Sequence, residues 1–277
     1  MTRENIPQES KEAAPEGPPH ELVHERDQKP AEASKGNLIA SHTAINNTEA
    51  TADQDQTRTD RDVQALMATY LSDQRLCRYA PAAADDGVAR EDIYIWNCDL
   101  SEAFHFALHI AEISCRNSIH SALLYKGDRW FEDTTFLKIL DPDRKRILEN
   151  ALADEIDQHG DSMDSHHLTS ALSFGFWEHL TTKRFDRYLF PRGFQKNFKH
   201  APWDAKLQDL QKLIESVRRW RNRIAHHNAI FDKKPSSKYQ DILRLISWSS
   251  PELETWVAKR CKVNQTINAR PKGTKHG

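Results

Sequence analysis

The residues best suited to chemistry lie together at the end of one amphipathic stretch. Arg221, Asn222 and His226 bring a guanidinium, an amide and an imidazole into six positions. A guanidinium binds phosphate through two parallel hydrogen bonds, an amide can orient a hydroxyl or an imidazole, and a histidine changes charge near neutral pH. Together they suffice to cleave an RNA phosphodiester without a metal ion. His226 would move the proton of a ribose 2′-hydroxyl or of the leaving 5′-oxygen, and Arg221 would neutralise charge on phosphorus.

The pattern around these residues predicts a helix in which Arg221 has an unusual position. Apolar residues recur at steps of three or four, namely Leu207, Leu210, Ile214, Val217 and Ile224. Arg221 stands four residues after Val217 and three before Ile224, where another apolar side chain would be expected. A permanent cation at that point requires a compensating partner or an anionic ligand.

The adjoining helix face carries Arg219, Asn222 and His226, with Glu215 one turn earlier. Arg221 and His226 are five residues apart, about 140° around an ideal helix, so they do not share a face. They could converge if the helix ends between them, or if two copies of the chain each supply part of the site. The alternative is a solvated basic helix end, which the negative end of the helix dipole favours.

Residues 221–228, Arg-Asn-Arg-Ile-Ala-His-His-Asn, resemble the R-N-x-x-A-H-H signature of the Abi-like (abortive infection) family of the HEPN superfamily. Three further segments resemble landmarks of that family in order, at 70–76, 116–120 and 172–177. The similarity covers residues 63–250. It implies an all-α, HEPN-like helical bundle that forms a homodimer and cleaves RNA, either in abortive-infection phage defence or as a toxin with an antitoxin or defence partner.

The resemblance gives the catalytic roles to Arg221, Asn222 and His226, while Arg219 and His227 also satisfy the spacing. Some members of the superfamily are inactive, so the alternative is a non-catalytic RNA-binding or protein-interaction module. The complete Arg-Asn-x-x-x-His set favours the enzyme, because affinity alone would need cations but no histidine at a fixed spacing. No glycine-rich nucleotide motif occurs, and no cofactor is expected.

A second set of polar residues lies on an earlier predicted helix, which Asp99 or Ser101 would cap and which would stop near Gly127. Glu112 and Arg116 are four residues apart on this helix. We interpret them as an ion pair that braces the core, with a supporting role in the chemistry as the alternative.

Basic residues expected to contact RNA are Arg218, Arg223, Lys183, Arg184 and Arg187. The last three begin a stretch in which cations alternate with Phe185, Tyr188, Phe190, Phe194 and Phe198. Such alternation suits single-stranded nucleic acid, whose phosphates and base faces it can engage. The alternative is that the rings pack inward and the cations are simply solvated. The aromatic cluster at 174–177 is expected in the core.

No metal site is expected. His159, His166 and His167 could be proposed as ligands beside His226 and His227, but no carboxylate or thiol has a spacing that completes a first shell. The four cysteines are widely spaced and form no C-x-x-C pair, so they are expected to be buried, reduced thiols.

Composition divides the chain into three parts. Residues 1–60 have no aromatic residue and carry 6 Lys and Arg against 12 Asp and Glu, a balance of −6, which leaves 33 against 29, or +4, for the rest. We therefore expect a disordered acidic tail at 1–60, the helical domain at 61–262 and a flexible basic tail at 263–277. No signal peptide or membrane-spanning run is present, so a cytoplasmic protein without membrane contact is expected.

Other elements follow from local signals. A first helix is expected at 62–79, an Ala/Asp loop at 80–92 and a helix start at 141–143. The polar stretch 158–167 is expected to be a loop, and 239–259 a pair of helices separated by a proline.

Overall fold

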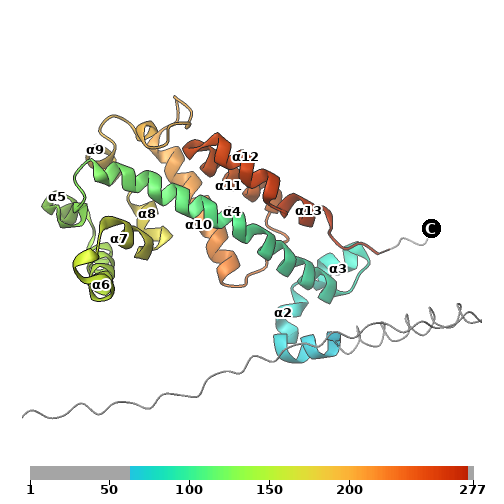
Figure 1. Ribbon diagram of the computed structural model, residues 1–277. Coiled ribbons are helices and arrows are strands. Elements are labelled where there is room, and N and C mark those ends of the chain that lie inside the picture. The colour runs from blue at the N-terminus through green and yellow to red at the C-terminus, as the bar shows by residue number, and fades with distance from the viewer. Residues whose placement is uncertain (1–62, 274–277) are drawn as a thin grey trace, which may run out of the picture. The chain divides into compact units, whose positions relative to one another are not determined.

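Helix α4 (Arg90–Leu124) is the element around which the other helices of residues 63–273 pack; the computed structural model describes these residues (Figure 1). It has 35 residues, so it is about 52 Å long. Its buried side chains recur every three or four positions, as at Leu100, Phe104 and Ala111. The described residues contain helices and turns but no strand, so the predicted all-α class is confirmed. The predicted acidic tail lies outside the described residues.

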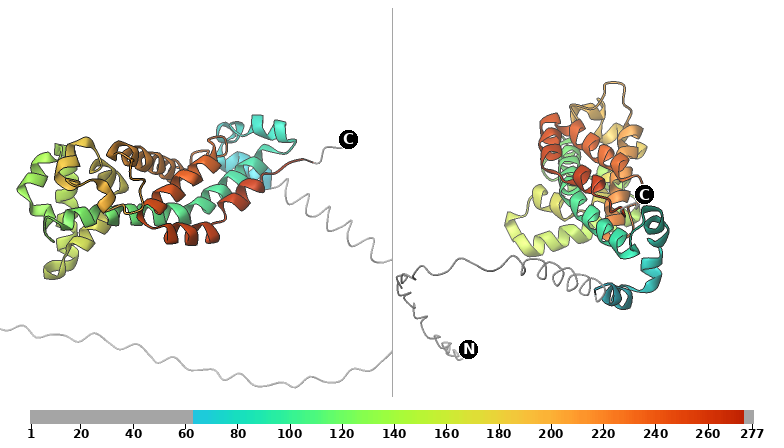
Figure 2. Two further views of the ribbon diagram at one scale, coloured as in Figure 1. Left: turned by 90° about the horizontal axis from the view of Figure 1, so that it is seen from above. Right: turned by 90° about the vertical axis from the view of Figure 1, so that its right-hand side faces the viewer.

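Four helices from the C-terminal half pack along α4 (Figure 2). They are α10 (Leu207–Ala225), α11 (Pro235–Ser249), α12 (Pro251–Arg260) and α13 (Val263–Asn268). Phe104 of α4 contacts two of these helices, because its ring centroid lies 5.2 Å from that of Trp220 in α10 and 6.1 Å from that of Tyr239 in α11. The predicted pair of helices separated by Pro251 is confirmed, and the Ser250 hydroxyl caps the second one.

Shorter helices gather at the two ends of α4 (Figure 1). At its C-terminal end are α5 (Thr134–Ile139), α6 (Pro142–His159), α7 (Ser165–Ala171), α8 (Phe174–His179) and α9 (Asp186–Leu189). At its N-terminal end are α2 (Asp73–Cys77) and α3 (Ala80–Asp86). Short 3₁₀ turns occupy Trp130–Glu132, Gly160–Ser162, Lys183–Phe185 and Phe194–Lys196. The helix start at Asp141 is confirmed, but most of the predicted loop at 158–167 is helical.

The predicted loop at 80–92 is also wrong, because α3 fills its first half. Alanines make up most of α3, and alanine has the highest helix propensity. Pro81 lies in the first turn, where a missing N–H leaves no hydrogen bond unmade. Gly87 then ends the helix with a φ of 70°, a conformation that glycine adopts without strain. The predicted first helix is broken at Ser72, whose φ is 66°.

Helix α4 begins earlier than predicted, so Asp99 and Ser101 lie inside it rather than at its cap. The N-terminal cap comes from Asp92, whose carboxylate accepts a hydrogen bond from the Ala89 N–H at 3.0 Å. The end near Gly127 is confirmed, and Gly127 has a φ of 115°.

The predicted flexible tail at 263–277 starts with a packed helix, so the folded part of the chain extends further than expected. Trp96 of α4 donates its indole N–H to the Thr266 carbonyl at 2.7 Å. Just after α13, Arg270 pairs with Asp86 at 2.7 Å. These contacts fix the described part of the segment against α3 and α4.

Aromatic rings between residues 174 and 198 belong to the core. Those in the predicted cluster and in the alternating stretch are all buried: Phe174, Phe176, Trp177, Phe185, Tyr188, Phe190, Phe194 and Phe198. The core position of the cluster is therefore confirmed. In the alternating stretch the rings pack inward, so no base can stack on them.

Candidate functional site

Helix α10 carries the candidate site at its C-terminal end, and its predicted apolar stripe is buried from Leu210 to Ile224, while Leu207 is half-buried. The helix closes with a Schellman motif, in which the Asn228 N–H donates to the Arg223 carbonyl and the His227 N–H to the Ile224 carbonyl, both at 2.9 Å. His227 has a φ of 53°, at the position where glycine is usual. The His226 N–H still donates to the Asn222 carbonyl at 3.0 Å, so the helix does not end before His226.

Arg221 has the compensating partner that its place on the apolar stripe predicts. Its Nε lies 3.3 Å from the carboxylate of Glu112 on α4, and its Nη1 donates to the Asn222 side-chain oxygen at 3.2 Å. The predicted Glu112–Arg116 ion pair is wrong: among the described residues the carboxylate of Glu112 pairs with Arg221 instead. The Arg116 Nε is buried and has no acceptor within that part of the chain.

Two other basic residues of this helix, Arg218 and Arg219, also have a carboxylate partner. Arg218 pairs with Glu178 of α8, in a half-buried position. Arg219 lies 2.6 Å from Glu215, as the four-residue spacing predicts, and its side chain is 73% exposed. An exposed pair of this kind contributes about 1 kcal/mol or less to stability, so Arg219 can exchange its partner for a ligand at little cost.

The two histidines at the helix end differ in their surroundings. Both are exposed, but His227 lines two cavities that also share Arg75 of α2. One cavity, of about 650 Å³, lies between α4 and the end of α10, and its wall includes Cys98 and His105. The other has a volume of about 280 Å³ and lies against α2. Arg75 donates to the His227 carbonyl at 3.2 Å, which holds the two elements together.

Arg75 and His105 are candidates that the sequence did not single out. Arg75 lies within 70–76, a segment that resembles a family landmark, so its position was a signal that could have been used. His105 lies on α4 two turns before Glu112, which places the two side chains on the same face.

Asn97 anchors the chain that follows the candidate site. Its buried side-chain oxygen accepts from the backbone N–H groups of Ile230 at 2.8 Å and Phe231 at 3.2 Å. On the other side, the Arg223 Nε donates to the Ala229 carbonyl at 2.8 Å. A buried asparagine on the apolar stripe of a helix needs hydrogen-bond partners for its side chain. The place of Asn97 on that stripe was therefore the signal available in the sequence.

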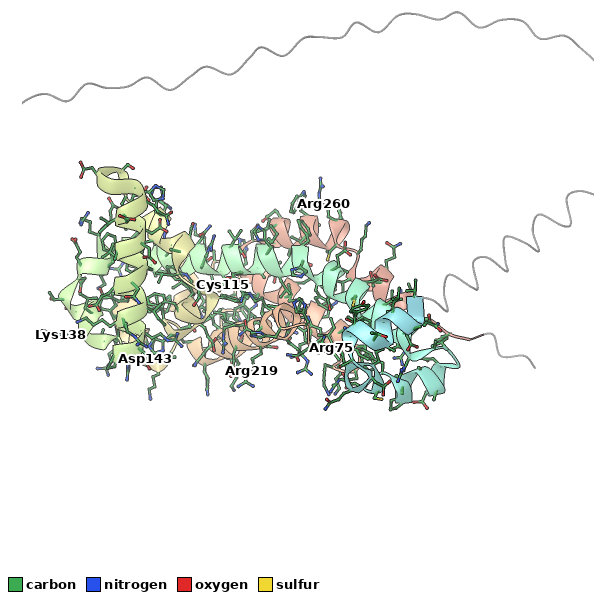
Figure 3. The ribbon with its side chains drawn as sticks, turned by 90° about the horizontal axis from the view of Figure 1, so that it is seen from below. Arg75, Cys115, Lys138, Asp143, Arg219 and Arg260 are labelled. Atoms are coloured by element: carbon green, nitrogen blue, oxygen red, sulfur yellow. The ribbon has the colours of Figure 1, made fainter. Side chains whose placement is uncertain are left out.

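Lys183, Arg184 and Arg187 are exposed but belong to a different part of the molecule. Arg184 donates to the Ile139 carbonyl of α5 at 3.1 Å. Figure 3 places Lys138, the neighbour of Ile139, at one end of the molecule, with Arg219 in the middle and Arg75 toward the other end. The structure therefore does not bring these three cations to the end of α10.

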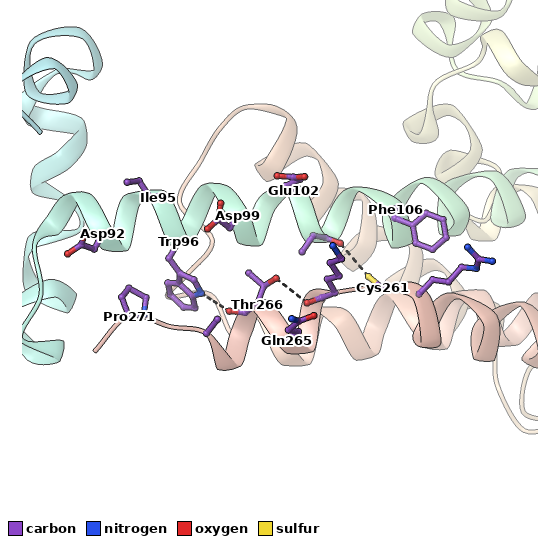
Figure 4. A pocket seen from close by; sticks show the side chains of 14 residues that line it. Asp92, Ile95, Trp96, Asp99, Glu102, Phe106, Cys261, Gln265, Thr266 and Pro271 are labelled. Atoms are coloured by element: carbon purple, nitrogen blue, oxygen red, sulfur yellow. Dashed lines mark hydrogen bonds between the residues drawn. The ribbon is translucent and has the colours of Figure 1, made fainter. Parts of the chain in front are cut away.

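A larger cavity, of about 870 Å³, lies between α4 and the α12–α13 segment (Figure 4). Its wall includes the carboxylates Asp92, Asp99 and Glu102 and the rings of Trp96 and Phe106. None of the residues that the sequence predicts for catalysis or RNA binding lines it.

The histidines between α6 and α7 form a separate group. The rings of His159 and His167 lie 4.1 Å apart, and His166 lies 5.2 Å from His120 of α4. Burial disfavours the charged imidazole and lowers the pKa of His120 to about 4. Within residues 63–273, no three His, Cys, Asp or Glu side chains converge in a way that could hold a metal ion.

The four cysteines indicate no further site. Cys115 is buried as predicted, but Cys77 and Cys98 are exposed and Cys261 is half-buried, because they lie on outer or cavity-facing sides of their helices. All four are free thiols.

In the part of the chain that the structure describes, no helix is both long and apolar enough to cross a membrane. No family model, curated protein or solved structure matches the chain.

Proposed function

We propose that the protein is a metal-independent endoribonuclease of the Abi-like HEPN type, acting in the cytoplasm in phage defence or as a toxin. The observation that supports this most is the fixed orientation of Arg221, five and six residues before two exposed histidines. Glu112 and Asn222 hold its guanidinium from two sides. A cation oriented before the substrate binds stabilises transition-state charge without reorganising.

The reaction needs one proton-transfer group and one phosphate-binding cation. His226 takes the proton of the ribose 2′-hydroxyl, and the 2′-oxygen then attacks phosphorus as the bond to the 5′-oxygen breaks. The protonated His226 then returns a proton to the leaving 5′-oxygen, so the products are a 2′,3′-cyclic phosphate and a 5′-hydroxyl. Arg221 binds the non-bridging oxygens. Asn222 acts through Arg221, because its side-chain oxygen accepts from that guanidinium.

The homodimer is part of this proposal, because α10 stays helical from Arg221 to His226 and the two side chains of one copy diverge. A two-fold axis would let Arg221 of one copy act with His226 of the other. Mixing a chain that carries Arg221→Ala with one that carries His226→Ala tests this sharing. Mixed dimers would have one intact site, so about a quarter of wild-type activity should return after random exchange. No recovery would place both residues in the same copy.

A second candidate is a non-catalytic RNA-binding or protein-interaction module. The pairing of Arg221 with Glu112 favours it, since the cation is compensated without any ligand. The two candidates differ in one measurable respect: the module binds RNA or a partner protein without turnover.

The chemistry is tested with an RNA that carries a single 2′-deoxyribose at the cleavage position. The full chain should bind this substrate as tightly as all-ribose RNA but leave it intact, because the nucleophile is missing. The cleaved all-ribose control should end in a 2′,3′-cyclic phosphate. Cleavage of the deoxy substrate at the same position would exclude attack by the 2′-hydroxyl.

A further inference from the structure

A cavity of about 450 Å³ between α10 and the segment 233–238 is lined by basic residues that the proposed reaction does not use. Its cations are Lys212, Arg219, Arg223, Lys233 and Lys238. Among the residues that the structure describes, Glu215 supplies the only carboxylate in its wall. Its volume lies within the range of small-molecule sites, and one phosphate ion would fill only part of it.

The charge of the cavity remains positive after nearby carboxylates are counted. Three cations have a carboxylate partner: Arg219 with Glu215 at 2.6 Å, Lys233 with Asp232 at 3.0 Å and Lys238 with Asp241 at 3.5 Å. Within residues 63–273, Lys212 and Arg223 have no carboxylate within 4 Å. The five cations and three carboxylates together therefore carry a net charge of +2. A cavity that concentrates positive charge in this way attracts anions.

Arg223 is already oriented for an anionic ligand. Its Nε is bound to the Ala229 carbonyl at 2.8 Å, while its two terminal nitrogens have no acceptor among the described residues. Because one edge of the planar group is fixed, less side-chain entropy is lost when the other edge binds two phosphate oxygens.

A second and independent observation comes from Trp220, which also lines the cavity. Its side chain is 3% exposed and packs on Phe104, yet its indole N–H has no acceptor in the described part of the chain. Buried indole donors ordinarily find a partner, so one residue of the cavity wall carries a buried donor that has no acceptor among the described residues.

The cavity and His226 lie on the same side of α10. Lys212, Arg219 and Arg223 precede His226 by 14, seven and three residues, which places all four within about 60° of one another around the helix. From Arg219 to His226 the helix rises about 10 Å. A strand whose phosphate enters the cavity can therefore continue along this face to the histidine.

We propose that this cavity binds a phosphate group of single-stranded nucleic acid and holds the strand beside His226. The choice of nucleic acid over a free anion rests on the proposed function and on the position of three cavity cations, Lys212, Arg219 and Arg223, on the same side of α10 as His226. The binding itself does not depend on cleavage.

The test measures fluorescence anisotropy of a fluorescein-labelled 12-nucleotide 2′-O-methyl RNA, which lacks the nucleophile, with the full chain. Lys212→Glu should weaken binding about tenfold at low salt and reduce the slope of log K against log salt by about 0.7, the loss of one single-strand phosphate contact. Arg223→Lys keeps the charge but loses the fork, so it should weaken binding several-fold. Lys259→Glu is the matched control, because Lys259 is an exposed helical lysine outside the cavity. It should bind within twofold of wild type.

Equal weakening by Lys212→Glu and Lys259→Glu would overturn the proposal, since it would show only an effect of total charge. Inorganic phosphate is the competing probe. If it binds the wild type as tightly as the oligonucleotide and Lys212→Glu weakens both, the cavity is a small-anion site and the nucleic-acid assignment is wrong. Normal binding by Lys212→Glu with RNA cleavage intact would overturn this inference alone. The predicted binding losses with no cleavage of RNA by the wild type would overturn the proposed function alone.

Discussion

Replacing Asn97 by alanine should destabilise the protein strongly, because this residue of α4 anchors the segment that follows the candidate site. The side chain is 5% exposed and its oxygen is the acceptor for the backbone N–H groups of Ile230 and Phe231, at 2.8 and 3.2 Å. Alanine leaves both donors buried without a partner. Each unpaired donor costs about 1–3 kcal/mol, and the longer bond falls at the low end.

The two losses together amount to about 3 kcal/mol, from which the higher helix propensity of alanine subtracts about half a kcal/mol. We therefore expect Asn97→Ala to lower the free energy of unfolding by about 2–3 kcal/mol in urea titrations at pH 7, with an unchanged m-value. Asn117→Ala is the matched control, because Asn117 is an exposed residue of the same helix. Its stability should be unchanged or slightly higher.

A difference of less than about 1 kcal/mol between the two variants would refute the argument. It would mean that the segment after the candidate site finds other acceptors when Asn97 is removed, and that Asn97 does not hold it in place. A lower m-value in Asn97→Ala would instead indicate a change in the denatured or native ensemble, so the m-values must agree for the comparison to count.

Three further predictions concern single side chains. Glu112→Gln should lower the free energy of unfolding by less than about 1 kcal/mol, because Arg221 is 44% exposed, and should tighten RNA binding by freeing its charge; weaker binding would contradict this. His227→Gly should raise the free energy of unfolding by about 0.5–1 kcal/mol, because a left-handed conformation is strained for histidine. The hydrogen bond from Arg75 is kept, since it is accepted by the backbone carbonyl. A clearly lower free energy of unfolding in urea titration would show that contacts of the His227 side chain outweigh the strain. Burial lowers the pKa of His120 in the folded state to about 4, whereas in the unfolded chain it is about 6.5. Between these two pH values only the unfolded chain binds the proton, so the free energy of unfolding falls as the pH is lowered from about 6.5 to about 4. His120→Phe should remove up to about 3 kcal/mol of that loss in denaturation curves across this range, and an unchanged pH dependence would contradict the assignment.

Features that depend on short-range patterns could be predicted from the sequence. The apolar stripe of α10, the helix start at Asp141 and the break at Pro251 all follow from residues close together in the chain. The need for a partner at Arg221 also followed from its place on the stripe. The identity of that partner did not, because Glu112 lies on another helix and its apparent neighbour Arg116 has a better local spacing.

The errors arose where tertiary packing outweighed local signals. Asp99 and Ser101 have the chemistry of helix caps, yet they lie within α4, because the buried stripe that begins with Ile93 runs past them to Leu100 and Phe104. The segment after Lys262 is polar overall, but Val263 is fully buried and α13 packs on α4. The cavity along α10 also could not be foreseen, since it combines residues of that helix with Lys233 and Lys238 from the following segment.

The central claim is that His226 moves the proton in RNA cleavage, and the most direct measurement is the single-turnover cleavage rate of the full chain in EDTA. The wild type should cleave RNA, and His226→Ala should be slower by about 10² to 10⁴, with RNA affinity within a few-fold of the wild type. Loss of activity in His227→Ala alone would assign the proton transfer to the neighbouring histidine. Full activity after replacement of both histidines would contradict the account.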